Sequence, residues 1–304
     1  MRIFVTGATG VIGRRAVPAL LEAGHDVTAA VRAPDTADPL KKIGAKPVAA
    51  DLFAPTALRY AIAGHDAVIN LATHMPRGTS LFLPWAWKEN DRIRREGAAN
   101  LADAAIAAGA ARFVQESFAP VYPDRGDAWI DETTPIKPSR YNRTVADAEA
   151  SAMRFGANGG AGIVLRFAAF YGPDSAFTRD LIDYVRRGWA PMPGAADSFI
   201  SSVSHDDAAA AVTAALELPA GVYNVVDDEP MRRRAYFDSL ADTLKVAPPK
   251  LMPPWLGFLF GSVGEMLARS LRISNRKLRE SSPWRPRYPS MREGWPAVVR
   301  GLMG

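Results

Sequence analysis

The chain has 304 residues, of which 48% are hydrophobic and 23% charged, as expected of an ordinary soluble globular protein. It contains no cysteine, which excludes disulfides, thiolate metal ligands and thiol catalysis. The net charge is +5, and eight Lys/Arg against one acid gather in residues 269–292. Because no nucleic-acid motif accompanies this basic stretch, we expect a solvated face and no nucleic-acid partner.

The first expected strand begins near residue 2, which leaves no room for a signal peptide. The most apolar stretch, residues 255–268, is too short to cross a bilayer and contains Glu265. We therefore expect a cytoplasmic protein with no membrane segment.

The start of the chain carries a short β-branched strand that runs into three glycines spaced G-x-x-G-x-x-G. Gly7 permits the tight turn, Gly10 lets the backbone approach a pyrophosphate, and Gly13 lets the following helix pack closely on the strand. The N-terminus of that helix, with its free N–H groups and positive dipole end, would face the phosphates. The run therefore predicts a dinucleotide site that includes Gly7, Thr9, Gly10, Val11, Ile12 and Gly13.

Strands and helices alternate through the first half of the chain, which is the pattern of a parallel α/β sheet. The expected strands cover residues 3–6, 26–31, 46–49, 67–71, 112–115 and 162–167. The expected helices cover residues 11–23, 56–63, 88–108 and 140–155. The predicted fold class is α/β, with a Rossmann-type doubly wound parallel sheet.

After residue 171 the elements become shorter, and prolines and tryptophans become more frequent. The elements expected there are helices at 177–187, 206–216 and 235–244 and strands at 200–203 and 222–226. We expect residues 1–171 to form an NAD(P)-binding domain and residues 172–304 to form a smaller α/β substrate-binding region packed on it. This region would close over the C-terminal edge of the sheet, where open α/β sheets bind ligands.

The residue that ends the second strand bears on the choice of cofactor. An acid at this position favours NAD by bonding the ribose hydroxyls, whereas Arg32 offers a cationic fork suited to a 2′-phosphate. Arg14 and Arg15 could assist. NADP(H) is therefore favoured, with NAD(H) as the alternative. Further cofactor contacts are expected after the third and fourth strands, at Asp51, Leu52, Leu71 and Ala72.

Short motifs accompany the glycine run along the whole chain. They are Asp51-Leu52, Asn70-Leu71-Ala72, Asn90, Arg112-Phe113-Val114, Leu165-Arg166, Tyr171-Gly172-Pro173 and the segments at 274–278 and 284–290. Together they resemble the extended and atypical short-chain dehydrogenase/reductase superfamily, and within it the NAD-dependent epimerase/dehydratase family. The resemblance implies a Rossmann-type fold and a nicotinamide cofactor, and it says little about the substrate.

The catalytic pattern of that family is altered in this chain. The family carries a Ser or Thr after the fifth strand and a Tyr-x-x-x-Lys motif on the next helix. Here Phe118 stands at the hydroxyl position, Tyr141 matches the tyrosine, and Val145 replaces the lysine. Without a lysine to lower its pKa, a tyrosine stays neutral and donates a proton more readily than it abstracts one. The resemblance thus implies a reductase with Tyr141 as proton donor.

Other polar side chains near the same sheet edge could act in catalysis. Ser117 reaches the site only if the backbone bends there, because a shift of one residue reverses a strand side chain. His74 follows the fourth strand, and an imidazole is a competent acid or base near neutral pH. Glu116, Tyr122 and Tyr171 are further candidates, with packing beside the pocket as the alternative role of the two tyrosines. No other ligands accompany His205, so no metal is expected.

The substrate and two alternative functions stay open. Aromatic residues in the segment 81–87 and at Trp255, Phe258 and Phe260 line an apolar pocket or form core or dimer contacts. The leading interpretation is an NADP(H)-dependent oxidoreductase that reduces a small apolar carbonyl or related compound. The alternatives are a nucleotide-sugar epimerase or dehydratase, and a non-catalytic NADP(H)-binding regulatory protein. We expect a monomer or a homodimer.

Overall fold

The computed structural model describes residues 1–32, 37–76 and 78–303. Within these residues, seven parallel strands form one sheet in the order β12-β7-β5-β4-β1-β2-β3. The strands are β1 (Arg2–Thr6), β2 (Asp26–Val31), β3 (Lys46–Ala49), β4 (Ala67–Asn70), β5 (Arg112–Phe118), β7 (Ala161–Phe167) and β12 (Gly221–Val225). The chain runs outward from β1 in both directions, which confirms the predicted Rossmann-type doubly wound sheet.

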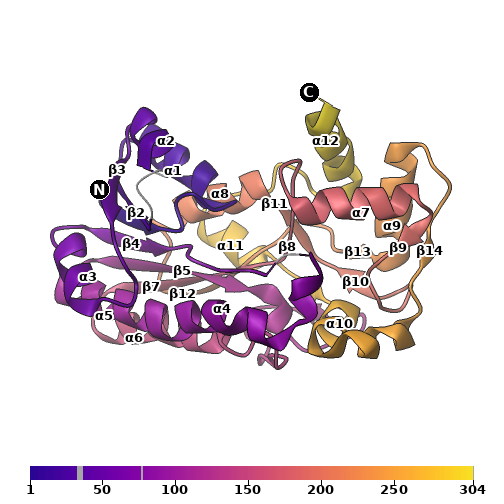
Figure 1. Cartoon of the computed structure of the whole chain (residues 1–304), viewed down its shortest axis with the longest axis horizontal. Helices are drawn as coiled ribbons and strands as arrows, with labels where there is room; N and C mark the ends of the chain where they lie inside the picture. The colour runs from indigo at the N-terminus through magenta and orange to yellow at the C-terminus, as the bar shows by residue number, and fades with distance from the viewer. Residues whose placement is uncertain (33–36, 77, 304) are drawn as a thin grey trace.

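The strands are apolar on both faces because helices cover both faces of the sheet (Figure 1). Along β1, Ile3 and Val5 pack against one helical layer and Phe4 against the other, all fully buried. The first layer contains α1 (Gly13–Glu22) and α8 (His205–Ala214). The second layer contains α3 (Pro55–Ile62), α5 (Ala98–Ala107) and α6 (Val145–Ala157).

The predicted boundaries of β2 and β3 agree with the structure, and those of β1, β4 and β7 differ by one residue. The strand β5 runs three residues beyond its predicted end, because Glu116, Ser117 and Phe118 continue the pairing with β7. The regular strand therefore determines which face of the sheet each of these three side chains takes.

The helix predicted over residues 88–108 is interrupted in the structure. It consists of α4 (Lys88–Arg92), a π-helical turn η4 (Ile93–Gly97) and then α5. Hydrophobic periodicity does not distinguish the extra residue of a π turn from a regular helix. Such turns are frequent at functional sites.

The helix predicted over residues 140–155 begins later than expected, at Val145. Tyr141 therefore lies in the turn before the helix. The buried Asn142 side chain stabilises this turn by donating to the Pro120 carbonyl oxygen at 3.2 Å. The position of the tyrosine is thus set by the loop after β5 and not by a helical face.

The later part of the chain forms a second core beside the sheet (Figure 1). Trp295 is fully buried there, with its ring 5.4 Å from that of Tyr236. The helices of this core are α7 (Ala176–Arg186), α9 (Arg233–Leu244) and α12 (Met291–Met303). Two elements that follow residue 171 belong with the main sheet, because β12 is its edge strand and α8 packs against one of its faces. The chain therefore returns to the sheet after entering the second core.

The remaining elements of the described residues are short. The helical ones are α2 (Ala37–Lys42), α10 (Gly261–Ala268), α11 (Arg276–Ser281), η2 (Gly78–Phe82), η3 (Pro84–Trp87), η5 (Ala119–Val121) and η6 (Pro254–Phe260). The strands pair as β6 (Trp129–Ile130) with β15 (Arg272–Ile273), β8 (Ala169–Tyr171) with β11 (Ser202–Ser204), β9 (Trp189–Ala190) with β14 (Lys250–Leu251), and β10 (Phe199–Ile200) with β13 (Met231–Arg232). In the described part of the chain, no helix has both the length and the apolar character needed to cross a membrane.

Candidate active site

A groove of about 790 Å³ runs along the carboxyl edge of the sheet, at the ends of β1, β2, β3 and β4. Its wall continues past His74 and Ala86 to Ile93 at the start of η4. A groove of this size at the switch point of a doubly wound sheet suits a dinucleotide. It is lined by predicted cofactor residues, namely Gly7, Thr9, Gly10, Arg32, Asp51, Leu52, Leu71 and Ala72.

The turn between β1 and α1 depends on two close backbone approaches. Gly7 has a φ of +68°, and a Cβ there would lie 2.3 Å from the Leu71 carbonyl oxygen. A Cβ on Gly13 would lie 2.1 Å from the Gly7 carbonyl oxygen. The Gly10 amide closes the turn by donating to that same oxygen at 2.9 Å. Glycine is therefore required for the helix to start at the groove.

Two other predicted cofactor residues, Val11 and Ile12, flank this turn without lining the groove. Val11 is exposed, and its carbonyl oxygen accepts from Arg15 Nη1 at 3.1 Å. Ile12 is buried, and its carbonyl oxygen accepts from the Ala16 amide at 2.8 Å. Neither residue lines the groove, so the cofactor contact expected at Val11 and Ile12 stays a prediction.

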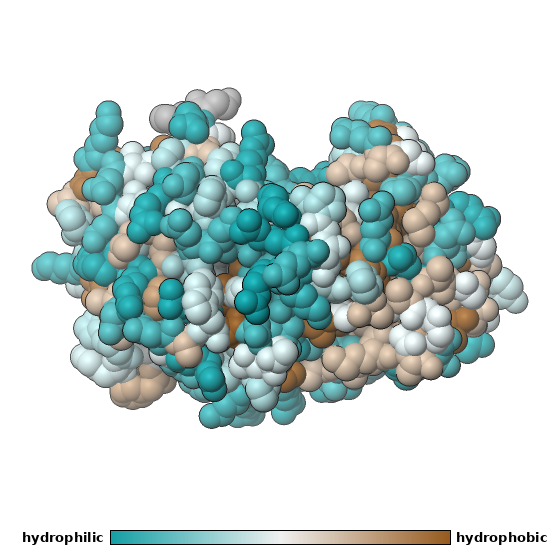
Figure 2. Space-filling view, turned by 180° about the vertical axis from the view of Figure 1, so that it is seen from behind, coloured by the Kyte–Doolittle hydropathy of each residue, from teal (hydrophilic) through white to brown (hydrophobic). Residues whose placement is uncertain are grey.

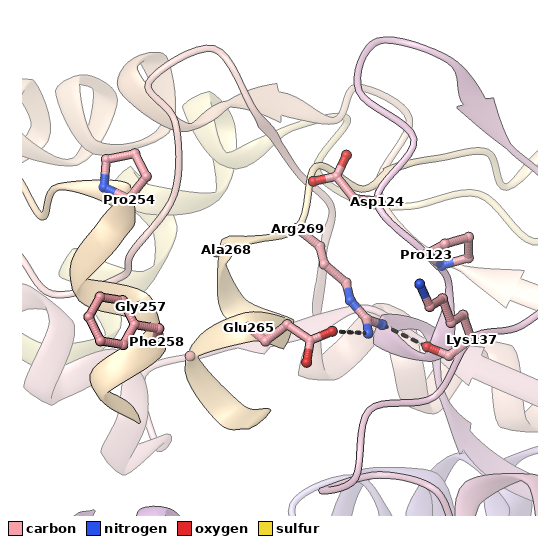
Figure 3. Close-up of a pocket in the computed structure, with 10 residues that line it drawn as sticks. Pro123, Asp124, Lys137, Pro254, Gly257, Phe258, Glu265, Ala268 and Arg269 are labelled. Atoms are coloured by element: carbon pink, nitrogen blue, oxygen red, sulfur yellow. Dashed lines mark hydrogen bonds and ion pairs between the residues drawn. The ribbon is translucent and has the colours of Figure 1, made fainter. Parts of the chain in front are cut away.

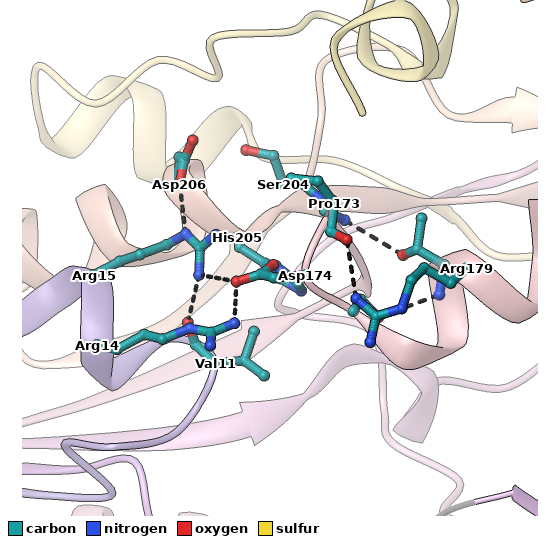
Figure 4. A network of polar contacts seen from close by, with 12 residues as sticks. Val11, Arg14, Arg15, Pro173, Asp174, Arg179, Ser204, His205 and Asp206 are labelled. Carbon is teal, nitrogen blue, oxygen red and sulfur yellow. Dashed lines mark hydrogen bonds and ion pairs between the residues drawn. The ribbon is translucent and has the colours of Figure 1, made fainter. Parts of the chain in front are cut away.

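The three arginines considered for a cofactor phosphate occupy different places. Arg32 is exposed and lines the groove. Arg14 and Arg15 instead form ion pairs with Asp174, and Arg15 Nε also donates to Asp206 at 2.6 Å (Figure 4). The expectation that Arg14 and Arg15 assist with the phosphate stays a prediction, and such a contact would compete with the acids that already bind them.

Asp174 joins the loop after β8 to both α1 and α8. Its carboxylate lies 2.8 Å from Arg15 Nη1 and 2.9 Å from His205 Nδ1 (Figure 4). Burial alone would raise the pKa of Asp174, but hydrogen bonds from Arg15 and His205 lower it to about 2. This network holds the first helix of the chain to its later part.

Tyr141 lies in a small apolar cluster and not in the groove wall. Its ring meets the ring of Trp87 edge-on, with 4.1 Å between the centroids. Trp87 directly follows Ala86 of the groove wall, so this Tyr141 cluster adjoins the groove. Within the described residues, the Tyr141 hydroxyl has no hydrogen-bond partner. The other members of the cluster are Leu81, Phe118, Val263, Met266 and Leu267.

Tyr141 is neutral at ordinary pH. Burial raises its pKa above the usual value, the charge of Arg94 lowers it, and the charge of Glu116 raises it. A neutral phenol can donate a proton but cannot accept one, so this environment suits reduction.

Ser117 lies away from the groove. Its hydroxyl donates to Glu149 Oε1 at 2.5 Å, and both side chains are buried. Glu149 also pairs with Arg166 at 2.7 Å, and Arg166 donates to the Tyr122 hydroxyl at 2.8 Å. The bend that Ser117 would need is absent, since β5 stays paired through Phe118. Ser117 and Tyr122 therefore belong to a buried network, and we give neither a role in catalysis.

His74 is exposed and lines the groove. Its backbone amide donates to Asn90 Oδ1 at 2.9 Å, which ties the loop after β4 to α4. The Asn90 Nδ2 is buried, with no hydrogen-bond partner in the described part of the chain. Because its side chain is exposed in the groove wall, His74 stays a candidate for contact with a bound ligand.

A buried ion pair acts on Tyr141 from nearby. Arg94 Nη2 and Glu116 Oε1 are 3.8 Å apart, and the two side chains are only 4% and 10% exposed. Burial raises the pKa of Glu116, and Arg94 opposes this effect. Sequence reasoning missed the pair, because nothing in the local pattern separates Arg94 from its exposed neighbours Arg92 and Arg95.

A second cavity, of about 390 Å³, lies between the loop after β5 and α10 (Figure 3). Arg269 in its wall is already engaged, because it donates to the Lys137 carbonyl oxygen at 3.0 Å and to Glu265 at 3.0 Å. None of the described lining residues belongs to the Tyr141 cluster. This cavity is therefore separate from the candidate reaction site.

The eight basic residues of the segment 269–292 make contacts within the chain. Arg279 pairs with Asp228 at 2.9 Å and Arg292 with Glu229 at 3.2 Å. Hydrophilic side chains gather across the middle of the molecule seen from behind (Figure 2). The basic stretch therefore has partners within the chain. Its other members contact acids, carbonyl oxygens or aromatic rings, namely Arg269, Arg272, Arg276, Lys277, Arg285 and Arg287.

Comparisons with known proteins agree with the Rossmann-type fold and with a nicotinamide cofactor. Residues 7–154 match a family model described as NAD(P)H-binding. A 3-diazoavenalumate denitrifying reductase from a Streptomyces species is 34% identical, over 97% of this chain and 99% of its own length. A 4-hydroxy-2-methyl-3-oxo-4-farnesyl-3,4-dihydroquinoline-1-oxide ketoreductase from Stigmatella aurantiaca is 30% identical, over 80% of this chain and 73% of its own.

Solved structures share the fold. The human epimerase family protein SDR39U1, solved with NADPH, superposes with a TM-score of 0.81 at 22% identity, covering 99% of each chain. The UDP-glucose 4-epimerase of Thermus thermophilus, solved with NAD, superposes with a TM-score of 0.79 at 24% identity, covering 100% of this chain and 99% of its own. At these identities the likeness concerns the fold alone.

Proposed function

Because the chain belongs to the short-chain dehydrogenase/reductase superfamily, in its extended and atypical branch, we propose that it is an NADP(H)-dependent reductase of a small apolar carbonyl or related compound. Tyr141 is the proton donor in this proposal. The observation that carries it is the phenol itself, which is buried beside the groove, neutral, and not hydrogen-bonded within the described residues. A free O–H is what a carbonyl oxygen requires when hydride reaches its carbon.

The groove residues would hold the dinucleotide, which when bound supplies the hydride. The backbone at Gly7 and Gly10 and the start of α1 would take the pyrophosphate. Arg32 would take the 2′-phosphate, and it is the basis for preferring NADP(H) over NAD(H). Asp51 would bond the adenine amino group, and Ala72 would leave space beside the sugars.

The substrate class is inferred from the surroundings of the tyrosine. Trp87, Phe118 and Met266 make its neighbourhood apolar, which excludes water and disfavours a sugar nucleotide. His74 stands in the groove wall and would contact a polar end of the substrate. Two relatives named as reductases are consistent with this direction of reaction.

A second candidate is reductive removal of nitrogen from an aromatic diazo compound. Its support is the relative named as a denitrifying reductase, which matches nearly the full length of this chain. Hydride addition to an aryl diazonium ion yields the arene and N₂, and this step needs no proton donor. The two candidates therefore differ in their dependence on Tyr141.

The test is turnover of carbonyl and aryl diazo compounds by the purified protein with NADPH. Wild type is compared with Tyr141→Phe and with Tyr60→Phe, which changes a tyrosine that is 81% exposed. If Tyr141 donates the proton, Tyr141→Phe lowers kcat for a carbonyl at least about 100-fold, while NADPH binding is unchanged. The control Tyr60→Phe should match wild type.

Other outcomes point elsewhere. Full carbonyl turnover by Tyr141→Phe would overturn the tyrosine assignment. Release of N₂ by both wild type and Tyr141→Phe would favour the diazo candidate. Hydride exchange into a sugar nucleotide would favour an epimerase or dehydratase, and NADPH binding without any turnover would favour a regulatory protein.

A further inference from the structure

Arg94 occupies an unusual place for a positive charge. It lies in the π turn η4 and is 3% exposed. In the described part of the chain its one ion-pair partner is Glu116, at 3.8 Å, which is too long for a hydrogen bond. The second carboxylate oxygen of Glu116 is also buried, with no partner among those residues. Buried polar groups with unused bonding capacity call for a functional explanation.

The helix side that carries Arg94 also contacts the turn holding the tyrosine. Trp87, seven residues earlier, meets the Tyr141 ring at 4.1 Å. Asp91 accepts from Thr144 Oγ1 at 2.8 Å, just after the tyrosine in the chain. Arg94 follows Asp91 by three residues, at the start of the π turn, and its charge acts on the Tyr141 phenol.

Glu116 approaches the tyrosine from the sheet. It lies on β5 two residues before Phe118, which is part of the Tyr141 cluster. Alternate residues of a strand project to the same face, so both side chains leave β5 on the side of the tyrosine. The positions at which the family carries its hydroxyl and its lysine hold Phe118 and Val145, which cannot carry charge. Arg94 and Glu116 are the charged groups acting on Tyr141.

We propose that the Arg94–Glu116 pair takes over the electrostatic role of the absent lysine: Arg94 stabilises the phenolate left when Tyr141 donates its proton, and the protonation state of Glu116 sets the strength of that effect. The proposal rests on the function proposed above. Both are positioning residues, since they act through Tyr141 and need not touch the substrate.

The charges around the pair define two states. The charges that act on Glu116 are those of Arg94 and of Glu149 on α6, and Glu149 is paired with Arg166 at 2.7 Å. Glu116 in turn acts on Tyr141. The charged side chain of α10, Glu265, is exposed and pairs with Arg269 at 3.0 Å, so it is already bound outside the Tyr141 cluster. When Glu116 is ionised, it balances Arg94, and the phenolate would form beside a second anion. When Glu116 is protonated, the charge of Arg94 acts on the phenolate alone.

The reduction links these states to the rate. The carbonyl carbon accepts hydride from the reduced nicotinamide, the electron pair of the C=O π bond moves to oxygen, and this oxygen takes the Tyr141 proton. The phenolate regains a proton from water when the product leaves. Burial raises the pKa of Glu116, which moves its titration toward neutral pH. Turnover should therefore be faster on the acid side of that titration.

The first experiment reads the ionisation of the tyrosine without turnover. Tyr141 is replaced by 3,5-difluorotyrosine, whose phenol ionises at lower pH, and fluorine NMR follows its titration in the NADP-bound protein. The backgrounds are wild type, Arg94→Gln, Glu116→Gln and the control Arg95→Gln. Arg95 is an exposed arginine on the same helix, paired with Asp147 at 3.3 Å, so its loss removes the same charge outside the site.

The midpoint should rise by about one pH unit or more in Arg94→Gln, fall in Glu116→Gln and stay unchanged in Arg95→Gln. Equal midpoints in all four proteins would overturn the proposal, whatever the catalytic role of Tyr141. If the midpoints shift as expected but Tyr141→Phe keeps full turnover, the pair controls the tyrosine and the function proposed for it is wrong.

The second experiment measures kcat against pH with saturating NADPH. Wild-type kcat should fall as pH rises through the Glu116 titration, and Glu116→Gln should keep the low-pH value across the range. Arg94→Gln should lower kcat about tenfold at all pH values with little change in the KM for NADPH, and Arg94→Lys should restore most of it. A Glu116→Gln profile that coincides with wild type would contradict the control by Glu116.

Discussion

The cofactor groove and the neighbouring Tyr141 cluster are built in different ways. The groove is made by backbone geometry at glycines and by exposed side chains at strand ends, such as Arg32 and Asp51. The Tyr141 cluster is made by buried packing, with charged pairs behind it such as Arg94–Glu116. The groove thus depends on local backbone requirements, whereas the Tyr141 cluster depends on contacts between segments far apart in the chain.

The largest effect on stability is expected from a substitution in the buried network behind the Tyr141 cluster. Arg166→Leu leaves the Glu149 carboxylate buried without its cationic partner, which should cost about 3–5 kcal/mol of unfolding free energy. Urea denaturation measures the loss. Arg154→Leu removes an exposed arginine whose ion pair is with Asp103, and it should cost less than about 1 kcal/mol. Equal losses in the two variants would contradict a buried structural network.

A single added methyl group should disturb the backbone turn at the groove. Gly13→Ala places a Cβ 2.1 Å from the Gly7 carbonyl oxygen, so α1 must shift away from β1. Overpacking strain of up to about 3 kcal/mol corresponds to a loss of roughly 100-fold in NADPH affinity, measured by fluorescence titration. Gly24→Ala has a strained φ of +81° but no atom within 4 Å, so it should leave the affinity unchanged. Tight NADPH binding by Gly13→Ala would mean that the turn does not hold the cofactor.

The groove was predictable from the sequence because each of its requirements is local. The turn at Gly7 has a positive φ, and the backbone at Gly13 lies too close to Gly7 for a Cβ. Arg32 lines the groove because it directly follows the end of β2. The strand alternation placed these residues at one sheet edge before any tertiary contact was known. The same local reasoning considers Arg14 and Arg15 for the phosphate, but it cannot show their ion pairs with Asp174 and Asp206, which lie far along the chain.

The surroundings of Tyr141 could be predicted only in part. The sequence singled out Tyr141 and the loss of its usual partners, but its immediate neighbours include Trp87 and Met266, which lie far from it in the chain. Ser117 is a candidate because it lies one residue before the position at which the family carries its hydroxyl. Only the observed strand pairing shows which way its side chain faces. Arg94 is buried because of the way η4 packs, and the hydrophobic periodicity of the sequence does not indicate this packing.

A third prediction tests the exposed positive charge of Arg32 in the groove wall. Arg32→Ser should reduce the preference for NADPH over NADH about tenfold to 100-fold, because charge-assisted bonds to a phosphate contribute about 1.5–3 kcal/mol. The ratio of kcat/KM for the two cofactors measures it. Arg14→Ser is the matched control, since Asp174 already binds Arg14, and the ratio should not change. A preference for NADPH that survives in Arg32→Ser would move the phosphate contact elsewhere.

The smallest effect concerns the Asp174 network, which joins the two parts of the molecule through groups that are partly exposed. The pKa of Asp174 is about 2 in the folded protein against 3.8 as its ordinary value, so its ionised form is favoured by folding. Its stabilisation is fully present above about pH 4 and is lost as pH falls toward 2. Solvent screening limits the contribution to about 1 kcal/mol. Asp174→Asn should therefore be less stable than wild type at neutral pH, and the difference in urea midpoint should shrink on acidification. A difference that stays constant with pH would show that the network acts through packing and not through charge, which would bring it closer in kind to the Tyr141 cluster than to the groove.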